Sequence, residues 1–139
     1  MAPAKPPPMW MVRLNAAVLR RGLRIGTQQL LTVRGRKSGE PRSTPVSLAT
    51  VNGERYIVAA FANAAWVSNV RAAAEATLSR GRSSELVRLR EIPVPDREPM
   101  LRAFLQQVRG GVRFFGGRTA DEVVAEAKEY PVFRITTVD

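Results

Sequence analysis

Apolar residues recur along the chain in short runs separated by turn-forming residues, a pattern typical of a protein rich in short strands. The pattern predicts strands at residues 29–34, 43–50, 55–61, 76–80, 84–92 and 131–137. Asn52-Gly53 lies between two of these strands and is the strongest short hairpin signal, while Gly81 marks another hairpin turn. Because hairpins dominate and strands do not alternate regularly with helices, we expect a mostly antiparallel sheet.

Apolar residues at helical spacing predict helices at 9–24, 64–74 and 96–108, and a further helix after Thr119. Asn63, Asp96 and Thr119 stand where N-caps are needed for the last three helices. The glycine-rich stretch 110–117, which holds Phe114 and Phe115, is predicted to be a loop. The fold class expected is therefore α+β: a small barrel of mostly antiparallel strands with helices packed outside.

A chain of 139 residues is expected to form one domain. Residues 1–8 are a flexible proline-rich lead, and residues 9–139 form the domain, which begins with the amphipathic helix at 9–24. That helix places Trp10 and Leu14 on one side and arginines on another. We favour a helix that covers the core, but docking on an anionic membrane surface is a second interpretation.

Charge is unevenly distributed over the chain, whose net charge is +10. Between Arg13 and Arg42 eight basic residues oppose only Glu40, whereas residues 43–139 are nearly balanced. One end of the molecule is therefore cationic, as suits a polyanionic ligand, an anionic membrane or nucleic acid. We do not expect nucleic acid, because the cations lie in a tight turn and on a helix face with few interleaved aromatics.

The chain has no Cys and no His. Disulfides, the usual zinc sites, cysteine nucleophiles and histidine-based triads are excluded, and we predict neither a catalytic side chain nor a metal site. An enzyme of this composition needs a cofactor for its chemistry. No apolar run reaches the ~20 residues that a membrane-spanning helix requires. We expect a cytoplasmic protein, at the inner face of the membrane if the helix at 9–24 docks there.

The turn at 34–42 joins the first two strands and concentrates four cations with two glycines and a proline. Arg36, Lys37 and Arg42 are expected to face one small volume, toward which the backbone amides near Ser38 and Gly39 can also turn. The turn is either an anion-binding loop or a solvated basic tip, and on composition alone the two are equally favoured.

Three segments carry a family resemblance: Leu-Leu-Thr-Val-Arg-Gly-Arg-Lys-Ser-Gly-Glu-Pro-Arg-Ser-Thr-Pro-Val, a Trp-x-x-Asn helix, and a closing Tyr-Pro-Val-Phe-Arg-Ile. Together they resemble the deazaflavin-dependent nitroreductase and quinone reductase family over residues 28–136. The resemblance implies a split β-barrel of the flavin-reductase type. It also implies coenzyme F-420, a deazaflavin with a phosphate and an oligoglutamate tail, and this polyanion suits the cationic end of the chain.

The resemblance also implies cofactor-binding residues. Those implied to hold the phosphate and the acidic tail, or to shape the turn around them, are Arg36, Lys37, Ser38, Gly39 and Arg42. Those implied to contact the ring are Thr44, Pro45, Val46, Ala60 and Phe61, and those implied to close the cleft are Trp66 and Asn69. Taken alone, Trp66 also suits a core aromatic and Asn69 a helix residue facing water.

Two departures from the family pattern bear on the cofactor-binding geometry and on the substrate, respectively. The loop between Phe61 and Trp66 is several residues shorter than the family's glycine-rich loop. The tyrosines of nitro-reducing relatives are not evident, since the aromatics in that part of the chain are Phe114, Phe115 and Tyr130. Reduction of nitro drugs is therefore not assumed.

The function expected is transfer of a hydride from reduced coenzyme F-420 to a quinone-like, nitro or other conjugated acceptor. No side chain is an obvious proton donor, so solvent or a held water is expected to supply the proton. FMN is a less favoured cofactor because it lacks the acidic tail. The alternative is a non-catalytic protein that binds F-420, another flavin or a lipid-like ligand in the same barrel. A homodimer is a further expectation, since barrels of this kind often pair.

Overall fold

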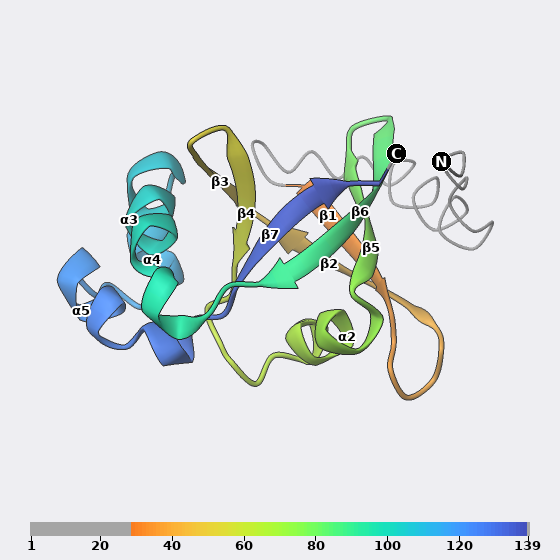
Figure 1. Ribbon diagram of the computed structural model, residues 1–139, viewed down its shortest axis with the longest axis horizontal. Helices are drawn as coiled ribbons and strands as arrows, with labels where there is room; N and C mark the ends of the chain where they lie inside the picture. The colour runs from red at the N-terminus through yellow and green to blue at the C-terminus, as the bar shows by residue number, and fades with distance from the viewer. Residues whose placement is uncertain (1–28, 139) are drawn as a thin grey trace.

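The strands form one continuous antiparallel sheet in the computed structural model, which describes residues 29–138 (Figure 1). The proline-rich lead and the helix predicted at 9–24 lie outside the described residues. The sheet has seven strands in the order β2-β1-β5-β6-β7-β4-β3. Their bounds are β1 Gln29–Arg34, β2 Pro41–Val46, β3 Leu48–Val51, β4 Glu54–Val58, β5 Glu75–Arg80, β6 Ser83–Glu91 and β7 Val132–Thr137.

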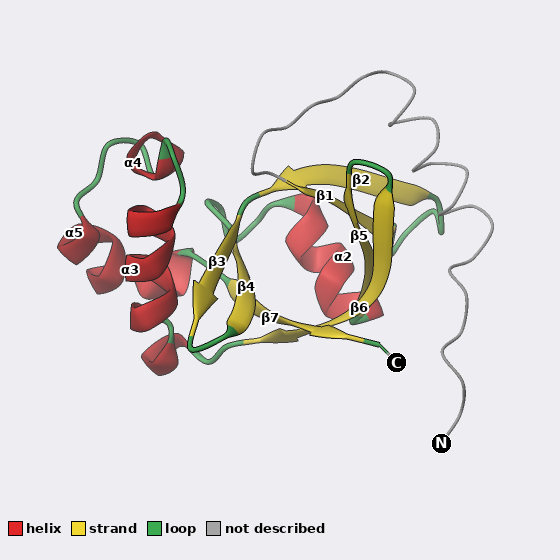
Figure 2. Ribbon diagram, turned by 90° about the horizontal axis from the view of Figure 1, so that it is seen from above, coloured by secondary structure: helices red, strands yellow, loops and turns green. Residues whose placement is uncertain are grey.

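The two edge strands are consecutive in the chain, so the sheet must curl. β2 pairs only with β1 and β3 only with β4, yet Ser47 alone separates them in sequence. Edges joined by one residue cannot lie at opposite ends of a flat sheet. Figure 2 shows the result, a sheet curled into a half-barrel around an enclosed interior. The expected antiparallel barrel of the split type is thereby confirmed.

The helices occupy two places. α2, Ala65–Ala73, lies across one end of the barrel, beside the turn that joins β1 and β2 (Figures 1 and 2). The remaining helices pack outside β3 and β4: η1 Val94–Asp96, α3 Glu98–Gln107, α4 Gly111–Phe114, α5 Ala120–Ala125 and η2 Ala127–Glu129. No helix between residues 29 and 138 combines the length and apolar character that crossing a bilayer requires.

The core is divided by the sheet. Inside the barrel, Leu31, Ile57 and Phe133 pack against Val67 and Val70 of α2. On the outer face, alternate residues of β3 and β4 pack against α3 and α5, with Ala49, Tyr56, Val58, Leu101, Phe104 and Val123 all buried. The last three residues of β4, Tyr56, Ile57 and Val58, are therefore covered on both faces of the sheet, which explains why three consecutive residues there are apolar and buried.

Several predicted boundaries were wrong. The strand predicted at 43–50 is two strands, because the chain crosses between the sheet edges at Ser47. The strand predicted at 55–61 ends at Val58, and the Phe61 side chain is 68% exposed. Residues 110–117 include the short helix α4.

The predicted helix caps had mixed outcomes. Asn63 and Asp96 do not cap their helices, whose N-cap positions fall one residue later, at Ala64 and Arg97, without side-chain capping bonds. Thr119 does cap α5: its hydroxyl accepts from the backbone N–H of Glu122, whose carboxylate accepts from the Thr119 N–H in return.

Candidate functional site

Two glycines shape the turn between β1 and β2. The Gly35 N–H donates to the carbonyl of Glu40 at 2.7 Å, and the Gly39 N–H donates to the carbonyl of Gly35 at 2.9 Å. A Cβ on Gly35 would lie 3.0 Å from the Glu40 carbonyl oxygen, and Gly39 has φ +74°. The turn therefore has one defined conformation that larger residues would disturb.

Asn69 anchors this turn to α2. Its side chain is 4% exposed, and its Oδ1 accepts from the backbone N–H of Arg36 at 3.1 Å and from Arg36 Nη1 at 2.9 Å. Arg36 Nη1 also approaches the carbonyl of Ala65 at 3.5 Å. The Asn69 side chain therefore does not face water, and its amide oxygen orients Arg36 of the turn.

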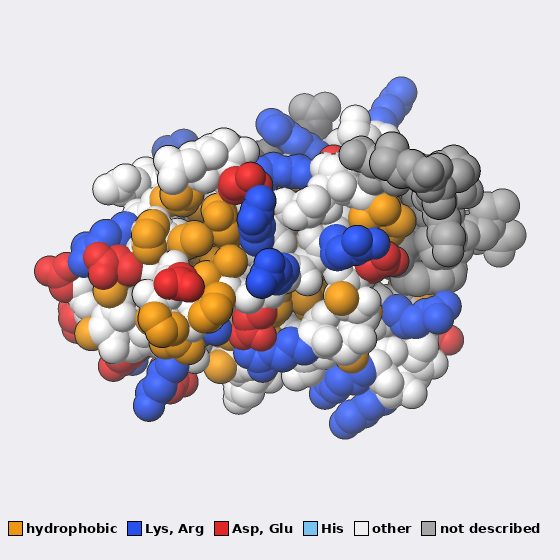
Figure 3. All heavy atoms as spheres, in the orientation of Figure 1, with side chains coloured by type: hydrophobic (Ala, Val, Ile, Leu, Met, Phe, Trp, Pro, Cys, Tyr) orange, Lys and Arg blue, Asp and Glu red, His pale blue; other side chains and the backbone are white. Residues whose placement is uncertain are grey.

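The turn, β2 and α2 together enclose a cavity of about 370 Å³, here called the basic cavity. Its lining residues are Gly35, Arg36, Lys37, Ser38, Arg42, Ser43, Thr44, Ala65, Trp66 and Asn69. Three of these described lining residues are cations and none of them is an acid. Figure 3 shows Lys and Arg side chains gathered at the lower right, over this end of the molecule. Such a donor set fits a phosphate or carboxylate group.

Trp66 belongs to both the core and the basic cavity. Its ring is half-buried, packs against the barrel core and lies 5.9 Å from the ring of Phe133 in a tilted arrangement. Trp66 also lines the basic cavity. The two interpretations of Trp66 from the sequence are therefore compatible.

A second cavity, of about 1000 Å³, lies between the loop after β4 and the segments around α4 and η2. We call it the aromatic cavity, because it is lined by Ala60, Phe61, Ala62, Asn63, Phe114, Phe115, Gly116, Arg118, Glu126, Lys128, Glu129 and Tyr130. Arg118 donates to the Glu126 carboxylate and to the Tyr130 hydroxyl. Asn63 of this cavity and Ala65 of the basic cavity are only two residues apart, so the loop before α2 borders the aromatic cavity while the first residue of α2 borders the basic cavity.

The structure does not bring all the expected ring contacts together. Thr44 lines the basic cavity, whereas Val46 is buried in the barrel core. Pro45 pairs with Leu30 and alternates with its neighbours, so its ring lies on the opposite face of β2. Gly39 shapes the turn without lining the basic cavity, and Ala60 and Phe61 line the aromatic cavity instead.

Sequence reasoning missed several lining residues. Gly35, Ser43 and Ala65 join the basic cavity because they neighbour residues that were expected there. The charged residues of the aromatic cavity, Arg118, Glu126, Lys128 and Glu129, lie far along the chain from Phe61, and no local pattern connects them.

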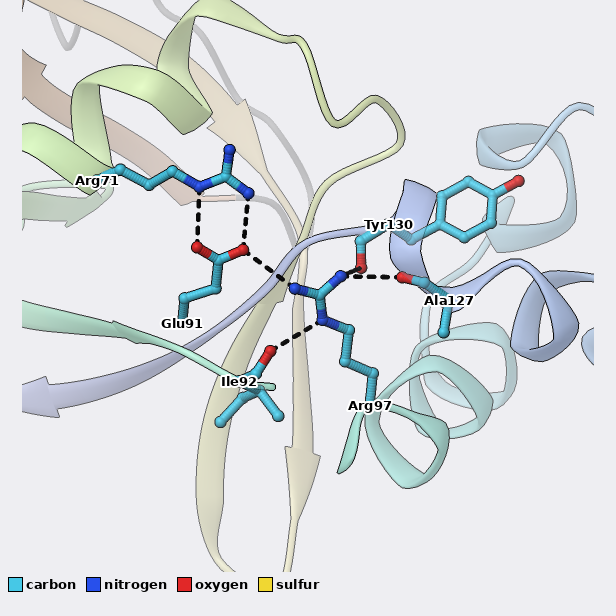
Figure 4. Close-up of polar contacts among 6 residues, drawn as sticks. All are labelled: Arg71, Glu91, Ile92, Arg97, Ala127 and Tyr130. Carbon is cyan, nitrogen blue, oxygen red and sulfur yellow. Dashed lines mark hydrogen bonds and ion pairs between the residues drawn. The ribbon is translucent and has the colours of Figure 1, made fainter. Parts of the chain in front are cut away.

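Sequence reasoning also missed a charge network built around one buried arginine (Figure 4). Arg97 is 4% exposed and donates to the carbonyls of Ile92 and Ala127, each at 2.9 Å, and to that of Tyr130 at 3.4 Å. Its Nη2 reaches Glu91 Oε2 at 3.0 Å. Arg71 of α2 binds the same carboxylate with two parallel bonds of 2.8 and 2.7 Å.

The network perturbs the ionisation of its members. The bidentate bond to Arg71 holds the pKa of Glu91 below its ordinary value, and the charges of Arg71 and Arg97 act in the same direction against partial burial. Burial lowers the pKa of Arg97, which the Glu91 carboxylate opposes. The bond to Glu91 raises the pKa of Arg71. Glu91 is therefore the shared anion that stabilises two cations.

Solved structures similar to this chain show the fold. One, described as a domain-swapped dimer, is 20% identical with TM-score 0.59, covering 91% of this chain and 97% of its own. An F420-H2 dependent reductase is 23% identical with TM-score 0.53, covering 80% and 95%. A Clostridium acetobutylicum protein of the pyridoxinephosphate oxidase family is 8% identical with TM-score 0.56, covering 92% and 84%.

A comparison with curated proteins finds no match. A family model described as F420H(2)-dependent quinone reductase matches residues 8–124. That match spans well over half of the 139 residues. It includes α2 and the turn at residues 34–42, here called the basic turn. The resemblance seen in the sequence is confirmed, and coenzyme F-420 is the cofactor that the family implies. The chain therefore belongs to the F420H(2)-dependent quinone reductase family and is an F-420-dependent oxidoreductase.

Proposed function

We propose that the chain reduces a quinone-like acceptor with coenzyme F-420, whose phosphate and acidic tail lie at the basic cavity. The observation that carries this proposal is the set of Arg36, Lys37 and Arg42 around one cavity with no acid among its described lining residues. A single phosphate or carboxylate there would meet several charge-assisted donors at once. The anion-binding interpretation of the turn is thus favoured over a solvated tip.

The role of the chain's own residues is to bind the cofactor and to orient it. Asn69 holds Arg36 toward the cavity, and Gly35 and Gly39 keep the turn in its conformation. Trp66 supplies an apolar wall against which part of a flat ring can pack. When bound, reduced F-420 supplies a hydride from its ring carbon, so that a quinone that also takes one proton from solvent becomes a quinol while the coenzyme becomes oxidised.

The acceptor is expected in the aromatic cavity. The loop of Ala60–Asn63 borders it, two residues before α2, so an elongated cofactor can extend from the basic cavity to its edge. Phe61 and Phe114 expose 68% and 39% of their surface and offer faces for a planar ring. We favour a quinone over a nitro compound, since the tyrosines of nitro-reducing relatives are not evident in the sequence.

Two titrations test the cofactor. We expect F-420 to bind more tightly than FMN, because FMN lacks the acidic tail that the basic turn would hold. Fluorescence of each cofactor gives the Kd, and equal or tighter binding of FMN would contradict the proposal. Mixing the reduced F-420 complex with 2-methyl-1,4-naphthoquinone then measures turnover. Binding without oxidation of the coenzyme would favour the alternative, a non-catalytic carrier.

Four further expectations stay proposals. One similar structure is described as a domain-swapped dimer, which supports a homodimer here that light scattering can test. Docking of residues 9–24 on anionic lipid can be tested by sedimentation with liposomes. The cytoplasmic location and the absence of nucleic acid among the partners also stay predictions.

A further inference from the structure

One carboxylate connects the walls of the two cavities. Glu91 ends β6, and its Oε2 is shared by Arg71 Nη2 at 2.7 Å and Arg97 Nη2 at 3.0 Å, while its Oε1 accepts from Arg71 Nε at 2.8 Å (Figure 4). Arg71 lies on α2, two residues after Asn69 and five after Trp66. The Arg71 fork therefore sets the position of the helix that walls the basic cavity.

The other arm of the network reaches the aromatic cavity. Arg97 donates to the carbonyls of Ala127 and Tyr130, which bracket the turn that carries Lys128 and Glu129. Lys128, Glu129 and Tyr130 all line that cavity. Because Arg97 is buried and its fork is planar, its orientation fixes these carbonyls and the backbone between them.

We propose that Glu91 is a positioning residue that fixes α2 relative to residues 127–130, and thereby the cofactor wall relative to the acceptor wall. The inference rests on the proposed function, in which a ring bound near α2 must face an acceptor in the aromatic cavity. Hydride transfer depends steeply on this alignment, since a misplacement of about 1 Å can cost a rate factor of about 100.

Geometry distinguishes this role from that of an ordinary surface ion pair. The chain contains such a pair, Arg88–Glu75, with one contact of 3.4 Å and both side chains about half exposed or more. The Glu91 carboxylate instead accepts three bonds from two guanidinium groups, one of them on a buried arginine. A single contact can slide, whereas the two parallel bonds from Arg71 define both the distance and the angle between its guanidinium group and the carboxylate.

The test compares Glu91→Gln with the control Glu75→Gln, which removes the exposed pair on the neighbouring strand. A glutamine amide keeps the size of the side chain but removes its charge and replaces one of the two acceptor oxygens with an NH2 donor, which faces a guanidinium group that can only donate. We expect the single-turnover rate of 2-methyl-1,4-naphthoquinone reduction by the preformed F-420 complex to fall about 10- to 100-fold. The affinity for F-420 should fall less than the rate, since the cations of the basic turn are unchanged.

A second readout does not depend on the coenzyme. In a Trp10→Phe background the remaining tryptophan is Trp66 on α2, so its fluorescence reports the position of that helix. Glu91→Gln should increase quenching of Trp66 by acrylamide, while Glu75→Gln should not. Arg71→Lys keeps a charge without the fork and leaves Arg97 paired, so it should show the same changes with less effect on folding.

The outcomes separate the two proposals. Wild-type rates and Trp66 quenching in both Glu91→Gln and Arg71→Lys would overturn the positioning role even if F-420 binds. A wild-type protein that fails to bind F-420 would overturn the proposed function, and the Trp66 quenching would then still decide whether Glu91 positions α2.

Discussion

At the scale of single residues, the cations of the basic turn should contribute to binding and little to folding. Lys37 and Arg42 are exposed, so their removal should cost at most about 0.5 kcal/mol of stability. A charge-assisted bond to phosphate or carboxylate is worth about 1.5–3 kcal/mol. We therefore expect Lys37→Ala and Arg42→Ala each to weaken F-420 binding about ten- to a hundredfold by fluorescence titration.

The matched control is Glu40→Ala, which removes an exposed charge of the opposite sign from the same turn. It should leave binding equal or tighter, and none of the three variants should move the melting temperature of the free protein appreciably. Arg42→Lys should fall between wild type and Arg42→Ala, because a point charge cannot replace a bidentate fork. Normal binding by both alanine variants would mean that the turn is only a solvated tip.

The sequence could predict which residue types meet at the turn, but not the bond that orients them. Arg36 and Asn69 were both expected at the site, yet their hydrogen bonds join residues 33 positions apart and no local pattern encodes that contact. Pro45 was expected beside Thr44, although the two-residue period of a strand places them on opposite faces. Local periodicity could have corrected the second expectation and not the first.

At the scale of elements, α2 ends under strain. Ala74 follows its last turn with φ +60°, a left-handed conformation that costs a non-glycine residue about 1–2 kcal/mol. Glycine avoids this cost but loses about 0.5–1 kcal/mol more chain entropy on folding. We expect Ala74→Gly to stabilise the protein by about 0.5–1 kcal/mol in urea unfolding.

The same substitution one residue earlier is the control. Ala73 is the last helical residue of α2, so Ala73→Gly should destabilise by up to about 1 kcal/mol. Opposite signs for the two variants would show that the left-handed residue, and not the loss of a methyl group, decides the outcome. If both Ala74→Gly and Ala73→Gly destabilise the protein, the backbone at Ala74 is not strained.

Elements were predictable where a local signal sufficed. The Asn52-Gly53 turn and the helix cap at Thr119 depend on neighbouring residues, and both form as expected. The break at Ser47 was missed because it has no turn signature and follows from the closure of the barrel. The caps expected at Asn63 and Asp96 failed since each helix begins one residue beyond the position that such a cap requires.

At the scale of the molecule, polar groups connect the barrel to the outer helices, and no pattern in the sequence predicts their contacts. Arg97 lies two residues after Pro95, at the start of a predicted helix, where an arginine is expected at the surface. It is buried because the end of β6 and the turn at 127–130 supply a carboxylate and carbonyls around it. Only the assembled fold brings these acceptors together.

This network predicts how stability depends on pH. The pKa of Glu91 is lowered in the folded state, mainly by its bond to Arg71, so its contribution is present above the ordinary value of 4.5 and is lost as pH falls through the lower folded value. At pH 7, Glu91→Gln should lower the free energy of unfolding by about 1.5–3 kcal/mol, the range for hydrogen bonds to charged groups.

Below pH 4.5 the difference in unfolding free energy between wild type and Glu91→Gln should narrow, because the Glu91 carboxylate takes up a proton first in the unfolded wild-type chain and at lower pH in the folded protein as well. Thr119 also lowers the pKa of Glu122, but that group is present in both proteins and cancels in the difference. Glu75→Gln should differ little from wild type in unfolding free energy at every pH, since an exposed ion pair contributes little to stability. Urea unfolding at several pH values measures each difference. A difference for Glu91→Gln that stays constant down to pH 3 would mean that the side chain stabilises the protein through its shape, not through the charge shared by the two arginines.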